Sequence, residues 1–313
     1  MPQPIVVIAG PTASGKTAMA IDIACEFTGT VINADSMQVY KELHVLTARP
    51  DATDEARVPH RLFGVLSAAE VCSAGRWLEM TTAEIALAHA DDRLPVIVGG
   101  TGLYLKVLME GLASVPKIAD DVRRETRALH ARLGGQAFHV ALAEKDPDAA
   151  ARIAAGDTQR LIRAYEVVVG TGRPLSHWQR QTDAVPAPPG RFATIILMPP
   201  RETLYATIDA RFDAMIEAGA LDEVAALDAL GADPGVPAMK ALGVKELRRY
   251  RNGECSLDEA SADAKRATRN FAKRQITWLR HQIQGKIVLA QYSARLREEI
   301  ISFIRQFLLT GPL

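Results

Sequence analysis

The segment Gly10–Thr17, with the sequence GPTASGKT, decides the fold of this chain. It directly follows the apolar run Ile5–Ala9 and precedes an amphipathic segment that begins at Ala18. This is the pattern G-x-x-x-x-G-K-[ST], the P-loop, between a buried strand and a helix. Successive backbone N–H groups in such a loop surround phosphate oxygens, and the helix adds the positive end of its dipole. The segment therefore predicts a binding site for a diphosphate or a triphosphate and leaves open which molecule carries it.

The composition is that of an ordinary soluble protein. Of the 313 residues, 48% are hydrophobic and 24% are charged, with a formal net charge of zero, and this length suits one large domain or a core with an insertion. No run approaches the roughly 18 apolar residues of a membrane span, and the first strand begins too early for a signal peptide. The cysteines Cys25, Cys72 and Cys255 form neither a metal spacing nor a disulfide framework. We expect a reduced, cytoplasmic protein with no membrane contact.

Five short apolar runs predict strands. They are continuous rather than alternating, as in a parallel sheet that is covered on both faces. Helical segments separate them, so the predicted class is α/β, with a P-loop NTPase-like parallel sheet as the core. Ligands bind at the carboxyl ends of such strands. The runs are residues 5–9, 30–34, 95–98, 192–198 and 286–291.

An inserted all-helical domain is predicted between the third and fourth runs. We place this domain at residues 113–188 and the core at residues 1–112 and 189–313. The proline-rich segment 183–190 closes the insertion, and a further helical stretch covers residues 201–230 of the core. The helical patterns of the insertion cover residues 120–133, 136–145, 147–155 and 157–170.

Two strand ends carry residues that are capable of chemistry. Asp35 directly follows the second run, where a carboxylate can bind Mg²⁺, act as a general base or cap the next helix. The third run ends in the glycine turn Gly99–Gly102 instead of the aspartate that a standard NTPase has there. Within this turn, Thr101 can approach a ligand closely or simply cap the following helix.

A strongly basic helix is predicted over residues 264–281, which contain six Lys or Arg and no Asp or Glu. At about 100° per residue its cations fall on one side, and we expect the apolar side to pack on the core. The resulting basic ridge is typical of a surface that binds a phosphate backbone, although a solvated charged face is the alternative. The same two alternatives, a phosphate-binding surface or a solvated face, remain open for five polar residues of the insertion, Arg123, Arg124, Gln159, Arg160 and Arg163. The ridge consists of Arg266, Arg269, Lys273 and Arg280, opposite Ala267, Phe271 and Trp278.

Eight segments together resemble the tRNA dimethylallyltransferase (tRNA isopentenyltransferase) family nearly from end to end. The P-loop alone is widespread, whereas ADSMQVY and AKRQITW are far more specific. The chain lacks the Cys/His zinc module of eukaryotic relatives, so we expect a bacterial type. The segments are GPTASGKT at 10–17, ADSMQVY at 34–40, TARP at 47–50, GGTGLY at 99–104, DTQRLIRAYEV at 157–167, SHW at 176–178, IDARFDAM at 208–215 and AKRQITW at 272–278.

The resemblance implies transfer of the dimethylallyl group of dimethylallyl diphosphate to N6 of the adenosine directly 3′ of the tRNA anticodon, with diphosphate leaving. Asp35 and Thr101 match catalytic positions, and Asp35 takes the proton of the N6 amine. Mg²⁺ is the implied cofactor, sharing the charge of the leaving diphosphate, with Thr17 as its protein ligand. The implied diphosphate-binding residues are Gly10, Thr12, Ala13, Ser14, Gly15, Lys16, Thr17 and Arg211.

The implied partners are the tRNA anticodon stem-loop and dimethylallyl diphosphate, bound by a protein that we expect to be a monomer. The helical insertion and the basic ridge hold the stem-loop, and the target base leaves its stack to reach the protein. Ser36, Met37 and Gln38 line the adenine pocket. The implied tRNA-binding residues are Asp35, Ser36, Met37, Gln38, Thr101, Arg123, Gln159, Arg160, Leu161, Ile162, Arg163, Arg269 and Lys273.

Three other functions fit part of the sequence. A small-molecule P-loop kinase shares the loop and the core but needs neither the basic ridge nor so long an insertion. An enzyme that prenylates AMP could use the same loop and aspartate. A non-catalytic RNA-binding protein has no need of an intact Lys16, Thr17 and Asp35. The chain departs from the family pattern at Leu43–Leu46, Pro59–Arg61, Cys72 and Leu242–Val244.

Overall fold

The computed structural model describes residues 2–180, 185–233, 235–283 and 286–310, which form two compact units. Unit 1 comprises Met1–Met109 and Pro188–Leu313, and unit 2 comprises Glu110–Ala187. The predicted insertion, residues 113–188, covers nearly the same stretch as unit 2. Of its predicted closing loop, residues 183 and 184 lie outside the described residues.

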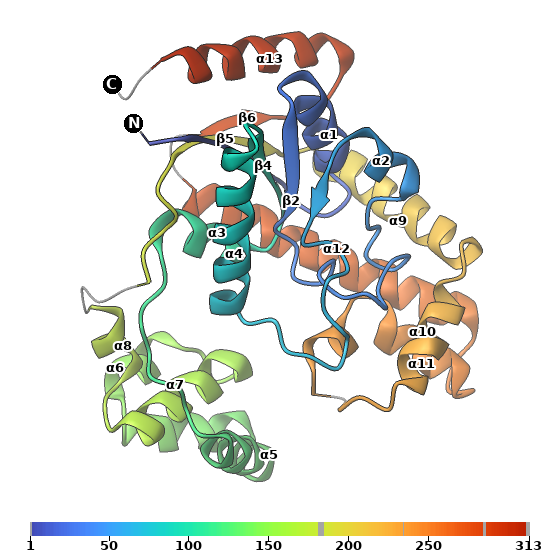
Figure 1. Ribbon diagram of the computed structural model, residues 1–313. Helices are drawn as coiled ribbons and strands as arrows, with labels where there is room; N and C mark the ends of the chain where they lie inside the picture. Colours follow the sequence, from blue (N-terminus) through green and yellow to red (C-terminus); the bar gives the residue numbers. More distant parts are fainter. Residues whose placement is uncertain (1, 181–184, 234, 284–285, 311–313) are drawn as a thin grey trace. The chain divides into compact units, whose positions relative to one another are not determined.

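Unit 1 (Figure 1) is built on a parallel six-stranded sheet. The order of its strands is β3-β2-β4-β1-β5-β6. All five predicted strands are confirmed. The sixth, β3, was missed because it has only two residues, lies at the sheet edge and carries no apolar run. The strands are β1 (Pro4–Ala9), β2 (Gly29–Asn33), β3 (His60–Arg61), β4 (Leu94–Gly99), β5 (Arg191–Leu197) and β6 (Lys286–Leu289).

Helices surround this sheet. The predicted helical stretch 201–230 is two helices, because Gly219 between them has a φ of 95° that helical residues do not adopt. Among the described residues, no helix is both long and apolar enough to cross a membrane. The helices of unit 1 are α1 (Lys16–Glu26), α2 (Ala52–Arg57), α3 (Ala74–Ala90), α4 (Gly102–Glu110), α9 (Arg201–Glu217), α10 (Ala220–Ala229), the 3₁₀ helix η1 (Pro237–Lys240), α11 (Val244–Arg251), α12 (Leu257–Gln282) and α13 (Ala294–Leu309).

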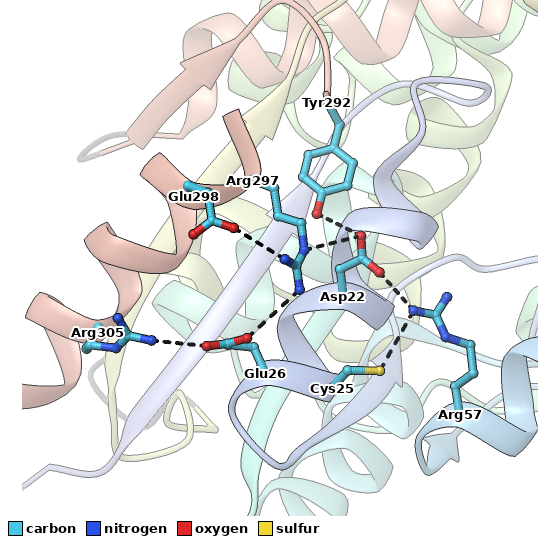
Figure 2. Close-up of polar contacts among 8 residues, drawn as sticks. All are labelled: Asp22, Cys25, Glu26, Arg57, Tyr292, Arg297, Glu298 and Arg305. Carbon is cyan, nitrogen blue, oxygen red and sulfur yellow. Dashed lines mark hydrogen bonds and ion pairs between the residues drawn. The ribbon is translucent and has the colours of Figure 1, made fainter. Parts of the chain in front are cut away.

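The helix that begins at the P-loop, α1, is fixed on the sheet by the C-terminal helix α13. Apolar residues of both helices, such as Met19 and Ile304, pack in one core cluster with Val6, Ile8 and Val96 of the strands. Figure 2 shows the polar edge of this contact, where ion pairs and hydrogen bonds join α1 to α13 and α2. The P-loop therefore leads into a helix that is held along its length. The polar contacts are Arg297 to Asp22 and Glu26, Arg305 to Glu26, Tyr292 to Asp22, and Arg57 to Asp22.

Unit 2 contains four helices over its described residues, besides one isolated β-bridge between Leu112 and Val185, and has its own small core. A buried cluster forms where α5, α6 and α7 meet, with Phe138 and Leu161 fully buried. Gly134, with φ 72° and ψ 169°, interrupts α5 at the predicted break between residues 133 and 136. The helices are α5 (Asp120–Ala143), α6 (Pro147–Arg152), α7 (Thr158–Thr171) and α8 (Leu175–Gln179).

Candidate active site

The P-loop of unit 1 forms a concave, cationic turn between β1 and α1. Ala13 and Gly15 both adopt positive φ, 63° and 85°, which turns the chain sharply before the helix begins at Lys16. The hydroxyl of Ser14 is buried and has no hydrogen-bond partner among the described residues. Lys16 Nζ donates to the carbonyl oxygen of Pro11 at 3.2 Å. The loop thus gathers a cation and an unused hydroxyl beside the positive end of a helix, as an anion site requires.

Arg211 of α9 adds a second cation to this loop. Its Nη2 donates to the hydroxyl of Thr12. Burial lowers the pKa of Arg211 below its usual value, and the negative charge of Asp35 opposes that shift. Burial likewise lowers the pKa of Lys16 to about 8, opposed by Asp35 and reinforced by Arg211. Two buried cations therefore lie near a single carboxylate. Because burying a cation is unfavourable without a compensating charge, this arrangement favours binding of a further anion.

Asp35 lies in a turn that is fixed from both sides. Its backbone N–H donates to Asn33 Oδ1 at 2.7 Å, and Asn33 Nδ2 donates back to the Asp35 carbonyl oxygen at 3.0 Å. The Asp35 carboxylate accepts from the backbone N–H of Met37 at 2.9 Å through Oδ1. Residues 36–39 form a turn and no helix, so the alternative in which Asp35 caps a helix is wrong. The second carboxylate oxygen, Oδ2, has no hydrogen bond among the described residues.

Thr101 lies beside this turn, because β2 and β4 are neighbouring strands of the sheet. Its hydroxyl accepts from the Ser36 backbone N–H at 2.9 Å and donates to Ser36 Oγ at 3.3 Å. The Thr101 backbone N–H donates to the carbonyl oxygen of Ala34 at 3.3 Å. The side chain thus stabilises the loop after β2 instead of capping α4, and it influences Asp35 through Ser36.

A pocket of about 280 Å³ opens between the Asp35 turn, the P-loop and helices α9 and α12. Its lining has a polar part, which includes Asp35 and Arg211, and an apolar part, here called the apolar side. Ser36 and Met37 line the pocket as expected, but Gln38 does not, because its amide donates to the carbonyl oxygens of Thr47 and Ala48. The apolar side consists of Leu46, Ile208, Phe212, Met215, Leu242 and Phe271.

Helix α12 presents a different face to the core than the sequence predicted. The buried face is rotated from the expected Ala267, Phe271 and Trp278, which are only partly buried. Small side chains and one amide let the helix approach the P-loop and the Gly99–Gly102 turn, and hydrophobicity alone did not reveal them. The residues that are buried are Ala260, Ala264, Thr268, Ala272, Gln275 and Leu279.

The basic ridge is partly neutralised by acidic side chains. Nη1 of Arg269 donates to both carboxylate oxygens of Asp209 of α9, at 2.6 and 2.7 Å, so its charge serves the contact between two helices. Arg266 pairs with Asp263 at 2.7 Å. Lys273 is exposed and has no ion pair among the described residues. The prediction of an outward ridge is right for Arg266 and Lys273, but Arg269 does not extend freely from it.

In unit 2, the predicted tRNA-binding residues separate into surface and core. Gln159 and Arg160 are exposed on α7, whereas Arg163 is half-buried and pairs with Glu166 at 3.8 Å. Burial lowers the pKa of Arg163, opposed by Glu166 and reinforced by the nearby Arg123. Leu161 is 0% exposed in the core cluster, so its side chain cannot contact a ligand, and Ile162 packs partly against the same cluster.

Gln275 is a residue of this site that the sequence motifs did not single out. Its Oε1 accepts from the Thr12 backbone N–H at 2.9 Å, and its Nε2 donates to the Gly100 carbonyl oxygen at 2.8 Å. One buried amide therefore joins the P-loop to the turn that carries Thr101. The available signal was its place in AKRQITW, at helical spacing from Ala264, Thr268 and Ala272.

Comparison with known proteins places the chain in a family. A family model described as "IPP transferase" matches residues 38–282, and a second, "Isopentenyl transferase", matches residues 3–66. This chain belongs to the IPP transferase family. The family resemblance predicted from its motifs is thereby confirmed.

Relatives within the IPP transferase family cover almost the whole chain. It is 57% identical over 281 residues to a tRNA dimethylallyltransferase of Rhodospirillum centenum, covering 90% of each chain. It is 52% identical over 313 residues to one of Rhodospirillum rubrum, covering 98% of this chain and 96% of the relative. The crystal structure of a Bacillus halodurans tRNA isopentenylpyrophosphate transferase superposes with a TM-score of 0.71 at 33% identity, covering 98% of this chain and 97% of that one. These bacterial relatives confirm the predicted P-loop NTPase-like class.

Proposed function

We propose that this IPP transferase moves a dimethylallyl group from dimethylallyl diphosphate to N6 of the adenosine directly 3′ of the tRNA anticodon. The observation that carries the proposal is the composition of one pocket. A carboxylate, Asp35, an anion site with Arg211 and Thr12, and an apolar side with Phe212 and Met215 all line it. A prenyl diphosphate and a nucleophilic amine need these three kinds of surface together.

The diphosphate of the donor binds at the P-loop. Lys16 and Arg211 balance its charge, and the buried Ser14 hydroxyl donates to a phosphate oxygen. These groups stabilise the diphosphate most strongly as it leaves, because its negative charge grows while the bond to the prenyl carbon breaks. The five-carbon chain extends toward the apolar side of the pocket, where burial stabilises it by about 0.8 kcal/mol for each CH₂ group.

Asp35 acts as the general base for the acceptor. Its Oδ1 is occupied by Met37 N–H, so the other oxygen, Oδ2, accepts the N6 amine. As the N6–carbon bond forms, the bond between the prenyl carbon and the diphosphate oxygen breaks, and the N6 proton passes to Asp35. Thr101 keeps Ser36, and with it the carboxylate, in position for this transfer.

The proposed Mg²⁺ cofactor suits the donor set at the P-loop. The described residues contain no cluster of three His, Cys, Asp or Glu side chains that could hold a metal by themselves. Mg²⁺ typically takes one or two protein oxygens and completes its shell with phosphate oxygens and water. The Thr17 hydroxyl at the start of α1 would supply such an oxygen. The ion would balance charge on the leaving diphosphate.

The tRNA is held by cations outside the pocket. Arg160 of α7 and Lys273 of α12 are exposed, and both suit contacts with backbone phosphates. The adenine leaves its stack to reach the pocket, and the anticodon loop allows this because its bases are single-stranded. Prenylation of free AMP would use the same pocket but would not depend on these cations.

Mass spectrometry of nucleosides tests the proposed function. Three reactions are run with the protein and Mg²⁺. Two contain dimethylallyl diphosphate, one with unmodified tRNA and one with AMP as the acceptor. The third contains ATP and small acceptors. We expect N6-dimethylallyladenosine at the position 3′ of the anticodon in tRNA, and far less product from AMP. Consumption of ATP without prenylation would instead support a kinase. Product from AMP but not from tRNA would identify the free nucleotide as the acceptor.

A further inference from the structure

We propose that Gln275 is a positioning residue that fixes the diphosphate loop relative to the turn of the general base. This inference rests on the proposed function, because it concerns how the two substrates of that reaction are aligned. Gln275 is 6% exposed. One end of its side-chain amide accepts a hydrogen bond and the other end donates one. Its oxygen accepts from Thr12 at 2.9 Å, and its nitrogen donates to Gly100 at 2.8 Å.

The turn after β4, Gly99–Gly102, has room for this contact because its glycines carry no Cβ atom. A Cβ atom at Gly100 would lie 2.4 Å from Gln275 Nε2, and one at Gly102 would lie 2.5 Å from the Trp278 ring. On the other side, a Cβ at Gly99 would lie 2.2 Å from the Ala34 backbone. The turn is therefore enclosed between the end of β2 and helix α12. Its glycines make room for protein groups, where the sequence had suggested room for a ligand.

The two partners of Gln275 each lie next to one substrate. Thr12 lines the pocket and accepts from Arg211 through its hydroxyl. Gly100 precedes Thr101, whose hydroxyl holds Ser36 beside Asp35. A displacement of either loop would change the distance between the leaving diphosphate and the attacking amine. Such misalignment by about 1 Å can cost a hundredfold in rate.

Only an amide satisfies both partners. A carboxylate at this position would direct negative charge at the Gly100 carbonyl oxygen, and a methionine of similar size would leave both backbone groups unpaired. The Thr12 N–H is engaged with Gln275, so Thr12 acts on the diphosphate through its hydroxyl alone. Thr12 is then fixed at two atoms, with its N–H bound to α12 and its hydroxyl to α9.

The test compares Gln275→Met and Gly100→Ala with the wild-type chain. Gln282→Met is the control, because Gln282 is exposed on the same helix. For each protein we would measure kcat, the KM for tRNA, the affinity for inorganic diphosphate and the melting temperature. We expect both Gln275→Met and Gly100→Ala to lower kcat by about tenfold to a hundredfold. The KM for tRNA should change by less than about threefold, because neither residue lies at the surface that holds the RNA.

Two results would overturn this role. One is a kcat of Gln275→Met equal to that of the wild type. The other is a parallel loss of kcat, tRNA affinity and diphosphate affinity that follows the melting temperature, which indicates a role in stability alone. If Gln275→Met does not fold, Gln275→Glu decides in the same way, because it keeps the acceptor for the Thr12 N–H but cannot donate to the Gly100 carbonyl oxygen. Gly100→Ala is less selective, because its Cβ would also lie 2.7 Å from the Gly10 carbonyl oxygen of the P-loop. If the wild type forms no prenylated adenosine, the proposed function has failed, and diphosphate affinity alone decides: weaker binding by Gln275→Met supports the role and equal binding overturns it.

Discussion

The hydroxyl of Thr101 accepts a hydrogen bond from the backbone N–H of Ser36 at 2.9 Å, and so joins the end of β4 to the loop after β2. Through this bond, a residue that does not line the pocket sets the orientation of the turn that contains Asp35. The side chain of Asp35 is otherwise held only by Met37 N–H among the described residues. The general base is thus oriented by its neighbours in the fold.

Replacing Thr101 by valine should lower kcat by about tenfold to a hundredfold, because the isosteric side chain leaves Ser36 N–H without its acceptor. Thr101→Ser keeps the hydroxyl and should retain most of the wild-type rate. Both rates are measured at saturating tRNA and donor, with melting temperatures as a check on folding. Equal rates for the valine and serine variants would exclude this role of the hydroxyl.

Glu223 of α10 should control the apolar side of the pocket. Its carboxylate accepts from three consecutive backbone N–H groups, those of His44, Val45 and Leu46, at 2.6 to 2.9 Å. Leu46 lines the pocket, so weakening these charge-assisted bonds should loosen the donor site. We expect Glu223→Gln to raise the KM for dimethylallyl diphosphate by about threefold to tenfold.

The control for Glu223 is Glu217→Gln, which changes an exposed carboxylate at the end of α9. It should leave the KM for the donor unchanged. If Glu223→Gln alters the KM for tRNA and not that for the donor, the segment 43–46 contacts the RNA instead.

Lys16 should make diphosphate binding depend on pH. Its pKa is lowered to about 8, so the side chain is cationic below that pH and becomes neutral above it. The affinity for inorganic diphosphate, divided by that of Lys16→Met at the same pH, should therefore fall toward one as the pH rises beyond 8. Because both proteins bind the same diphosphate at each pH, the ratio of their affinities cancels the effect of protonation of the diphosphate itself. A ratio that stays constant between pH 7 and pH 10 would contradict a titrating Lys16.

The basic ridge should separate into residues with different roles in tRNA binding. Lys273→Ala removes an exposed cation and should reduce the slope of log affinity against log salt by about one. Arg269→Ala breaks an ion pair with Asp209, so we expect a lower melting temperature and little change in the salt slope. Titrations of both variants with tRNA at several salt concentrations distinguish these effects. A larger change of slope in Arg269→Ala than in Lys273→Ala would reverse the assignment.

The parts that sequence predicted correctly depend on local patterns. The run Ile5–Ala9 and the loop that follows specify a strand, a turn and a helix within a single stretch, and all three are present. The break of α5 at Gly134 was equally local. In contrast, β3 has two residues and is a strand only because β2 lies beside it.

The parts that sequence could not predict depend on distant partners. The partners of Gln275 lie 263 and 175 residues away along the chain, so no local pattern could reveal that the amide bridges two loops. Arg269 looked free because Asp209 lies 60 residues earlier on another helix. Leu161 was included with a matching segment as a whole, although helical spacing directs its side chain into the core of unit 2.

The most direct test of the proposed mechanism is the single-turnover rate of Asp35→Asn with tRNA and dimethylallyl diphosphate, compared with the wild type and with Asp91→Asn, a change at an exposed aspartate. Asparagine keeps the shape of the side chain but cannot take the N6 proton. We expect the rate to fall by about a hundredfold to ten-thousandfold, with tRNA affinity retained and Asp91→Asn unaffected. A rate for Asp35→Asn within about threefold of the wild type would show that Asp35 is not the general base.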